Sequence, residues 1–278
     1  MSEKKITRKD FLRNIGKYSA GAAVGIAGLN ALSKDASAAD PVGFTWPYPW
    51  ADIDPEIARI KAHSLYYGGK ACCSGTFGGV AGTLADAMGA PWDTFPIEVM
   101  LFGRGGGVGW GATCGTLMGG AAIISLVTEK APSGALINEL WGWFTTAVLP
   151  SDAANEALYE TVKIEGALPQ SISESPLCHA SVSQWCLVAD KAVGSAERGE
   201  RCGRLSGDVA AKTVEILNAH FAETFVGTVA TPRSNAICMD CHGAGHDHNV
   251  MTNMKCTSCH TDAHSGVVQH EGCTTCHQ

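Results

Sequence analysis

Apolar residues in the central part of the chain recur every three or four positions, which is the period of an amphipathic helix. The stretch 133–149 is typical, because Leu136, Leu140 and Phe144 would lie on one side of a helix. The same pattern predicts helices over residues 51–67, 77–88, 116–129, 153–164, 173–193 and 204–225. The alternating pattern of β-strands is scarce along the chain. We therefore predict a mainly α domain over residues 39–230.

The first 38 residues have the character of an export signal rather than of a folded segment. A basic start precedes an apolar run over residues 15–32, and residues 36–38 are the small residues that a signal peptidase requires. The stretch 7–13 resembles a twin-arginine signal, with Lys9 in place of the second arginine. We predict cleavage near Ala38 and a periplasmic location. The alternative is an uncleaved membrane anchor, for which the run is only weakly apolar.

Composition narrows the classes of protein to which the chain can belong. With 45% apolar and 17% charged residues, it is neither disordered nor a coiled coil. The net charge of −7 argues against a nucleic-acid partner, because phosphate binding needs a basic face. Residues 105–127 carry no charge but contain eight glycines, which leave little apolar area to hold them in lipid. We expect no stable membrane span, and a buried glycine-rich loop that leads into a core helix.

The last 41 residues contain half of the twelve cysteines and most of the histidines. They hold three copies of the CxxCH pattern that attaches c-type haem: Cys238, Cys241 and His242; Cys256, Cys259 and His260; and Cys273, Cys276 and His277. In each copy the two thiols form thioethers with the haem vinyl groups, and the adjacent histidine is the proximal iron ligand. Zinc sites and thioredoxin-like pairs do not explain three histidines at the same offset. We predict an irregular multihaem c-type tail over residues 231–278, with its hinge at residues 231–235.

Three haems need six axial ligands, and the tail can supply all of them. Besides the three proximal histidines, it contains the candidate distal ligands His246, His248, His264 and His270. Full bis-histidine ligation is therefore possible without His63, His179 and His220, which we interpret as ordinary core or surface residues. About fourteen residues per haem cannot bury three macrocycles. We therefore expect a homodimer with its haems clustered at the interface.

The other six cysteines, Cys72, Cys73, Cys114, Cys178, Cys186 and Cys202, lie in the helical domain without CxxC pairing. An exported protein can hold them as three disulfides. Glycines around Cys72 and Cys114 favour a different interpretation, because glycine lets backbone N–H groups approach the sulfur atoms of an iron–sulfur cluster. Such a cluster needs about four thiolates. Twin-arginine export also carries folded proteins, so a cluster inserted before export is compatible with a tail that receives haem afterwards.

The spacing of these cysteines resembles the redox-active proteins named for a C_GCAxxG_C_C pattern. The residues that carry the resemblance are Cys72 and Cys73, the run 110–120 around Cys114, and then Cys178, Cys186 and Cys202. Thr113 and Gly115 stand where the pattern has glycine and alanine. Joined to a haem tail, over residues 50–278, the domain is similar to split-Soret cytochrome c of sulfate-reducing bacteria.

The resemblance implies a homodimeric periplasmic electron carrier with stacked bis-histidine haems, each of which takes one axial histidine from the other subunit. It also implies an iron–sulfur centre on four of the candidates Cys73, Cys114, Cys178, Cys186 and Cys202. That family has two haems per subunit, whereas this sequence has three motifs. Either the chain carries an extra haem, or one motif, such as the first, stays empty or binds something else. We expect three haems.

The motifs favour an electron carrier without a substrate of its own, which docks onto other redox proteins. A multihaem reductase of nitrogen or sulfur oxyanions is the enzymatic alternative, and it requires an open haem or cluster site. No paired carboxylates and no nucleophile with an adjacent base stand out in the sequence. A zinc- and disulfide-rich structural protein is the third possibility, and it would be colourless.

Overall fold

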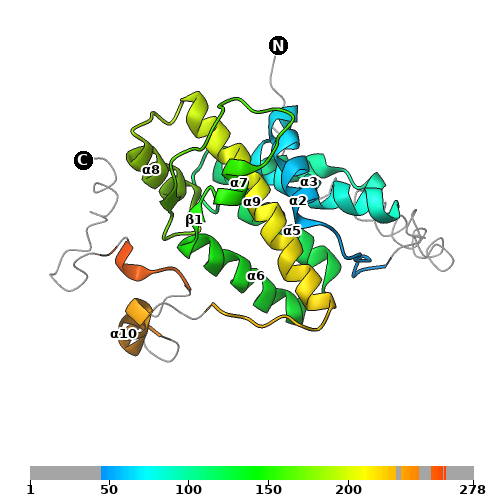
Figure 1. Cartoon of the computed structure of the whole chain (residues 1–278). Coiled ribbons are helices and arrows are strands. Elements are labelled where there is room, and N and C mark those ends of the chain that lie inside the picture. The colour runs from blue at the N-terminus through cyan, green and yellow to red at the C-terminus, as the bar shows by residue number, and fades with distance from the viewer. Residues whose placement is uncertain (1–44, 230–232, 244–251, 259, 261–278) are drawn as a thin grey trace, which may run out of the picture. The chain divides into compact units, whose positions relative to one another are not determined.

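The helical domain predicted from the sequence is present in a computed structural model of the chain (Figure 1), which is mainly α. The structure describes residues 45–229, 233–243, 252–258 and 260. The predicted signal over residues 1–38 lies outside the described residues. The compact unit begins at Trp46.

Six helices build the domain: α2 (Pro55–Leu65), α3 (Ala71–Met88), α5 (Gly115–Val127), α6 (Lys130–Thr146), α8 (Cys178–Ala189) and α9 (Ala196–Phe221). Short elements connect them: the π-helical turn η1 (Tyr66–Lys70), the 3-10 helices η2 (Trp92–Thr94) and η3 (Ile97–Gly103), and the short helices α4 (Arg104–Gly107) and α7 (Asp152–Glu156). The strands β1 (Val148–Leu149) and β2 (Ser171–Ile172) pair antiparallel, with Val148 opposite Ile172. The tail contributes α10 (Arg233–His242) and the 3-10 turn η4 (Cys256–Ser258).

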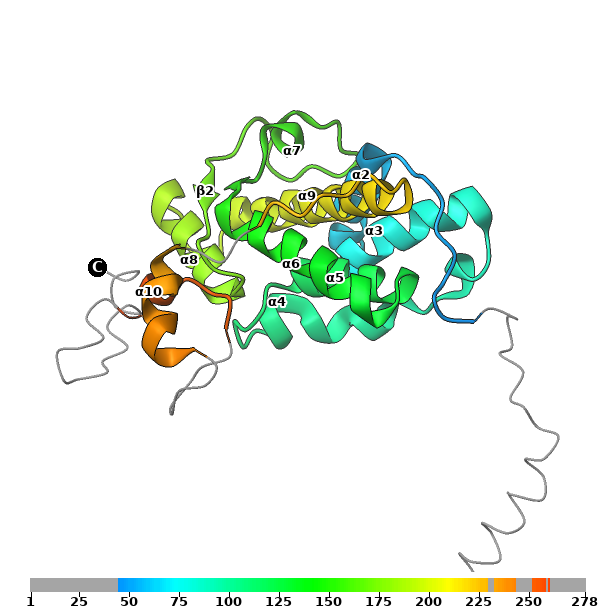
Figure 2. The same ribbon diagram turned by 90° about the horizontal axis from the view of Figure 1, so that it is seen from below.

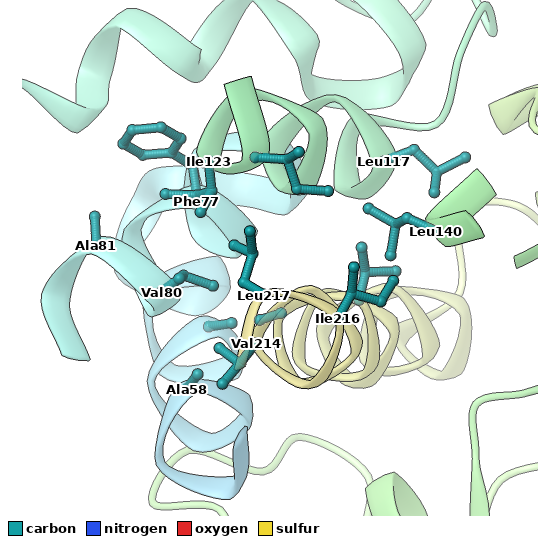
Figure 3. Packing of buried hydrophobic residues seen from close by; sticks show 14 of the residues in the cluster. Ala58, Phe77, Val80, Ala81, Leu117, Ile123, Leu140, Val214, Ile216 and Leu217 are labelled. Carbon is teal, nitrogen blue, oxygen red and sulfur yellow. The ribbon is translucent and has the colours of Figure 1, made fainter. Parts of the chain in front are cut away.

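Helix α9 is the central element of the core, and it contacts α2, α3, α5 and α6 (Figures 1 and 2). Its buried residues Val209, Val214 and Leu217 follow the helical period. Figure 3 shows the packing of this helix among Ala58 of α2, Phe77 and Val80 of α3, Leu117 and Ile123 of α5, and Leu140 of α6. Every position from 203 to 211 is buried, so this part of α9 is enclosed on all sides rather than on one face.

Small residues let the helices around α9 approach closely. A Cβ atom on Gly79 of α3 would come within 2.6 Å of the Cβ of Ala62 on α2. A Cβ on Gly119 of α5 would come within 2.5 Å of the backbone oxygen of Cys73 on α3. Because backbone atoms cannot move aside as a flexible side chain can, α3 and α5 meet at a distance that only glycine permits. The expected glycine-rich loop does lead into a core helix, since Gly105 and Gly106 precede α5 at positive φ. The loop is not buried as predicted, because Val108 and Trp110 are 55% and 89% exposed.

Helix α9 begins eight residues before the predicted start at Arg204. The hydroxyl of Ser195 caps it by accepting a hydrogen bond from the backbone N–H of Arg198 at 3.2 Å. The first two turns are polar, so the apolar period did not mark them. They contain Arg198, Arg201 and Cys202, three residues of the candidate functional site.

The predicted helix over 153–164 is wrong beyond Glu156. Asn155 exchanges two hydrogen bonds with the backbone of Leu168, each of 3.1 Å, and so ties the end of α7 to an irregular loop. Leu158, which the helical pattern placed on an inner face, is 89% exposed. A four-residue spacing of two apolar side chains was too little evidence for a buried face.

Within the described ranges, no helix has the length and apolar character needed to cross a membrane.

The close contact of α3 and α5 predicts a strong effect of a single methyl group. Gly119→Ala should lower the free energy of unfolding by about 1–3 kcal/mol, because the added carbon overlaps the backbone of Cys73. Gly134→Ala in α6 is the matched control, since its Cβ would meet no atom within 4 Å. The control should be neutral or more stable by about 0.5–1 kcal/mol. Guanidinium denaturation of both variants measures the difference, and equal stabilities would contradict the packing argument.

Candidate iron–sulfur cavity and haem segment

Four cysteines from four different segments line one cavity of about 290 Å³. Cys72 lies in the first turn of α3, Cys114 precedes α5, Cys178 begins α8, and Cys202 lies on α9. Arg104, Arg198 and Arg201 also line the cavity, together with Tyr66 and apolar side chains. The cavity thus combines soft sulfur ligands with permanent positive charge.

Backbone hydrogen bonds fix Cys114 and Cys178 beside each other. The N–H of Cys114 donates to the carbonyl of Pro176 at 2.8 Å, and the N–H of Cys178 donates to the carbonyl of Ala112 at 2.7 Å. The two thiols are themselves hydrogen-bonded. The Sγ of Cys114 also lies 3.2 Å from the hydroxyl of Thr116. The positions of these two sulfur atoms are therefore set by main-chain contacts between segments more than 60 residues apart.

Glycines let the backbone come close to the sulfur atoms, as the sequence indicated. A Cβ on Gly115 would lie 2.5 Å from the Sγ of Cys72, and a Cβ on Gly103 would lie 2.5 Å from the Sγ of Cys73. The N–H of Gly105 donates a hydrogen bond to the thiol of Cys72. Backbone donors of this kind stabilise thiolates and the sulfur atoms of iron–sulfur clusters.

Burial and hydrogen bonding divide the thiols into two classes. Burial raises the pKa of Cys72 to about 12. The hydrogen bond with Cys178 lowers the pKa of Cys114, although burial opposes this, and the positive charge of Arg201 lowers it further. The same hydrogen bond raises the pKa of Cys178. The hydrogen bond between Cys114 and Cys178 therefore favours one thiolate in this pair.

The cavity contains three of the five cysteines predicted as candidate cluster ligands, Cys114, Cys178 and Cys202, and adds Cys72. Cys73 is fully buried and packs into the hydrophobic core beside Gly103. Cys186 lies two turns after Cys178 on α8 and is not among the lining residues. The sequence contained Cys72 and Cys73 as a pair. Adjacent positions on a helix face different directions, and the pattern alone could not tell which of the two faces the cavity.

The six cysteines of the domain are free thiols in the structure. Within the ranges that the structure describes, no three histidine, cysteine or acidic side chains lie close enough together to hold one metal ion. The fit of the cavity to a cluster therefore rests on its soft donor set, its volume and the N–H groups that approach the sulfur atoms.

A buried hydrogen-bond network surrounds Glu200 near the N-terminal end of α9. The carboxylate of Glu200 accepts hydrogen bonds from Tyr67 at 2.7 Å, from the Nε of Arg204 at 3.0 Å and from the N–H of Lys163 at 3.0 Å. His63 contacts the same carboxylate through Nε2 at 3.0 Å. The expectation that His63 is an ordinary core residue agrees with this network. The network also fixes the turn of α9 that presents Arg201 and Cys202 to the cavity.

The described part of the tail brings two haem motifs together. Asn235 on α10 is fully buried, donates to the backbone carbonyl of Met254 and accepts the N–H of Cys256 at 2.9 Å. The thiols of Cys238 and Cys256, which begin the first and second motifs, are hydrogen-bonded to each other. His242 ends α10, and the N–H of His260 donates to the carbonyl of Cys256 at 2.9 Å.

The remaining predicted haem residues lie outside the described part of the chain. These are Cys259, Cys273, Cys276 and His277, and the candidate distal ligands His246, His248, His264 and His270. The side chain of Cys241 is also outside it.

Comparisons with known proteins agree with this arrangement. A family model described as "Putative redox-active protein (C_GCAxxG_C_C)" matches residues 71–216. Split-Soret cytochrome c of Desulfovibrio desulfuricans is 34% identical over 271 residues, which cover 92% of this chain and 95% of that protein. The chain belongs to the split-Soret cytochrome c family. The expected resemblance is thereby confirmed.

A solved structure of a split-Soret cytochrome c agrees with this fold. The structure, described as showing a novel iron centre in the protein from Desulfovibrio desulfuricans, matches with a TM-score of 0.71 and 34% identity. The match covers 84% of this chain and 97% of that chain. The mainly α fold is that of a split-Soret cytochrome, and membership of this family supports a redox role with haem and iron as cofactors.

The Glu200 network predicts a specific dependence of stability on pH. Burial by itself would raise the pKa of Glu200, but hydrogen bonds from His63, Tyr67 and Arg204 lower it to about 2. The ionised carboxylate therefore stabilises the folded state fully above its unfolded pKa of about 4.3, and the contribution is lost as the pH falls toward about 2. Glu200→Gln should be less stable than the wild type at pH 7, and the difference should narrow between about pH 5 and pH 2.

Denaturant titrations at several pH values measure this difference. Glu160→Gln, at an exposed glutamate, should follow the wild-type curve. A Glu200→Gln protein with a constant stability deficit over this range would contradict the role of the ionised carboxylate.

Proposed function

We propose that the protein is a periplasmic c-type cytochrome that transfers electrons through stacked bis-histidine haems and an iron–sulfur centre. The observation that carries the proposal is the convergence of four thiols on one cavity, in a chain whose tail holds three haem-attachment motifs. Its membership of a cytochrome family supports the general redox role. The cluster, the number of haems and their stacking are the parts that we propose beyond that membership.

Cys72, Cys114, Cys178 and Cys202 are the proposed cluster ligands, because these four line the cavity. When bound, the cluster supplies a one-electron donor and acceptor inside the domain. The chain's own residues hold the four sulfur atoms at fixed positions. They also donate hydrogen bonds to two of them, from the N–H of Gly105 to Cys72 and from the N–H of Thr116 to Cys114. The adjacent Arg198 and Arg201 offset the negative charge of the thiolates.

The tail supports haems that lie close to one another. Asn235 holds Cys238 and Cys256 next to each other, so the first two motifs would attach their haems at neighbouring points. Neighbouring attachment points favour stacking, which excludes water from the faces of both macrocycles. Two axial histidines on each iron leave no open position for a substrate, and this favours a carrier over a reductase.

The export signal and the homodimer belong to the same proposal. A cleaved signal predicts that the purified periplasmic protein begins near Ala39, and N-terminal sequencing tests this directly. A homodimer covers haems that a short tail cannot bury, and elution as a monomer at micromolar concentration would contradict it.

Removing one cavity thiol should remove the cluster. Cys72→Ala should lower the iron and acid-labile sulfide bound in addition to haem by more than about tenfold, because the cluster loses a ligand. Cys186→Ala is the matched control, since this thiol is not among the cavity residues, and it should retain the cluster. Chemical analysis of iron and sulfide after each purification measures both, with haem absorbance as the reference for loading. A cluster retained by Cys72→Ala but lost by Cys186→Ala would assign a different ligand set.

Carbon monoxide distinguishes the carrier from a reductase. It binds ferrous haem where an axial position is open, so the reduced spectrum should not change if every haem is bis-histidine ligated. A change in about a third of the haem absorbance would indicate one open iron among three haems and would favour the reductase. Oxidised and reduced spectra before addition serve as the control for complete reduction.

A further inference from the structure

Arg201 is a buried cation on the wall of the cysteine cavity. It lies on α9 next to Cys202, and only 1% of its surface is exposed. Arg201 and the Cys114 thiol line the same cavity. A buried charge is costly unless an opposite charge or hydrogen bonds compensate for it.

The hydrogen bonding of Arg201 is incomplete. One terminal nitrogen, Nη2, donates to the hydroxyl of Ser181 at 2.7 Å, and that hydroxyl is itself buried. The Nε of Arg201 is buried and has no hydrogen-bond acceptor within the part of the chain that the structure describes. No carboxylate lies within salt-bridge distance of Arg201 among the ion pairs of the described residues.

Arg204, one turn further along α9, is also buried, but its charge is compensated by a carboxylate and by several hydrogen bonds. Its guanidinium donates to the carboxylate of Glu200 at 3.0 Å, to the side chain of Asn155 at 2.8 Å and to the carbonyls of Gly166 and Ile164. Both arginines are buried, but only Arg201 lines the cavity that contains four thiols. Any further hydrogen-bond acceptor or counter-charge for Arg201 must therefore come from the cavity.

We propose that Arg201 is the counter-charge of the cluster and raises its reduction potential, with Ser181 holding the guanidinium in place. The inference rests on the proposed cluster. One-electron reduction adds a negative charge to a cluster that its thiolate ligands already make negative. A fixed positive charge in a buried, low-dielectric site stabilises this reduced state more than the oxidised one. A cluster sulfide would also supply the acceptor that the Nε–H of Arg201 lacks.

Replacing the charge tests the proposal. In Arg201→Gln the cluster should become harder to reduce, with the ratio of reduced to oxidised cluster at a fixed potential falling by tenfold or more. For a one-electron couple, a tenfold change corresponds to 59 mV. Arg201→Lys keeps the charge and should retain most of the wild-type potential. Ser181→Ala should shift the potential in the same direction as Arg201→Gln, by less, because the guanidinium loses its fixed position.

A redox titration of the full-length holoprotein, followed by the electron paramagnetic resonance of the reduced cluster, measures these potentials. Lys212→Gln is the control, because it removes a positive charge that is also on α9 but is not on the cavity wall, and it should not shift the cluster. The haem potentials of each sample show whether an effect is confined to the cluster.

The outcomes separate the two proposals. A wild-type protein with haem but without additional iron and sulfide would overturn the proposed cluster, and the role of Arg201 with it. A cluster that is retained with an unchanged potential in Arg201→Gln would overturn the role of Arg201 alone. If Arg201→Gln loses its cluster, Ser181→Ala decides, and a wild-type potential in that variant would count against the proposal.

Discussion

The packing of α9 against α2, α3 and α5 is the constraint on which the rest of the molecule depends. The C-terminal half of α9 supplies Val209, Val214 and Leu217 to the core, and Figure 3 shows the last two of these. The N-terminal turns of the same rigid helix carry Arg201 and Cys202 to the cavity. The core therefore fixes the position of one side of the cavity, and a shift of α9 along its axis would move a cation and a sulfur atom together.

A second side of the cavity is fixed by the contact of α3 with α5. Gly119 lets these helices meet at backbone distance, and Cys72 and Cys114 lie at the N-terminal ends of the same two helices. Because the helices cannot separate or rotate without breaking this contact, the two sulfur atoms stay close to each other. The close approach of backbone to sulfur at Gly115 extends the same packing into the site.

The features that could be predicted from the sequence are those that depend on residues close together in the chain. A CxxCH motif places both thioether sulfurs and the proximal ligand within five residues, so its chemistry needs no knowledge of the fold. The cavity is different, because its four cysteines come from segments as far apart as Cys72 and Cys202. Which of Cys72 and Cys73 faces inward depends on where α3 begins, and the apolar pattern placed that start at residue 77 rather than at Ala71.

The errors in the predicted helices have a related cause. Apolar periodicity reports burial against a core, and it misses turns that are fixed by polar contacts. The start of α9 depends on the Ser195 cap, and the end of α7 depends on the hydrogen bonds of Asn155. Both helix ends are fixed by polar side chains, and the spacing of apolar residues contains no information about these. The polar start of α9 is also the part that carries the cavity residues, so the site lay where the pattern was least informative.

The separation of core and tail bears on how two kinds of cofactor can be assembled on one chain. Within the described residues, the hydrophobic core draws its members from Tyr48 to Phe225, and none comes from the tail. The chain leaving α9 is attached by polar contacts, of which the clearest is the carboxylate of Glu139 accepting the N–H groups of Thr228 and Val229 at 2.8 and 3.0 Å. A domain that completes its core without the tail can close around a cluster first. This order agrees with the proposed export of a folded domain followed by attachment of haem to the tail.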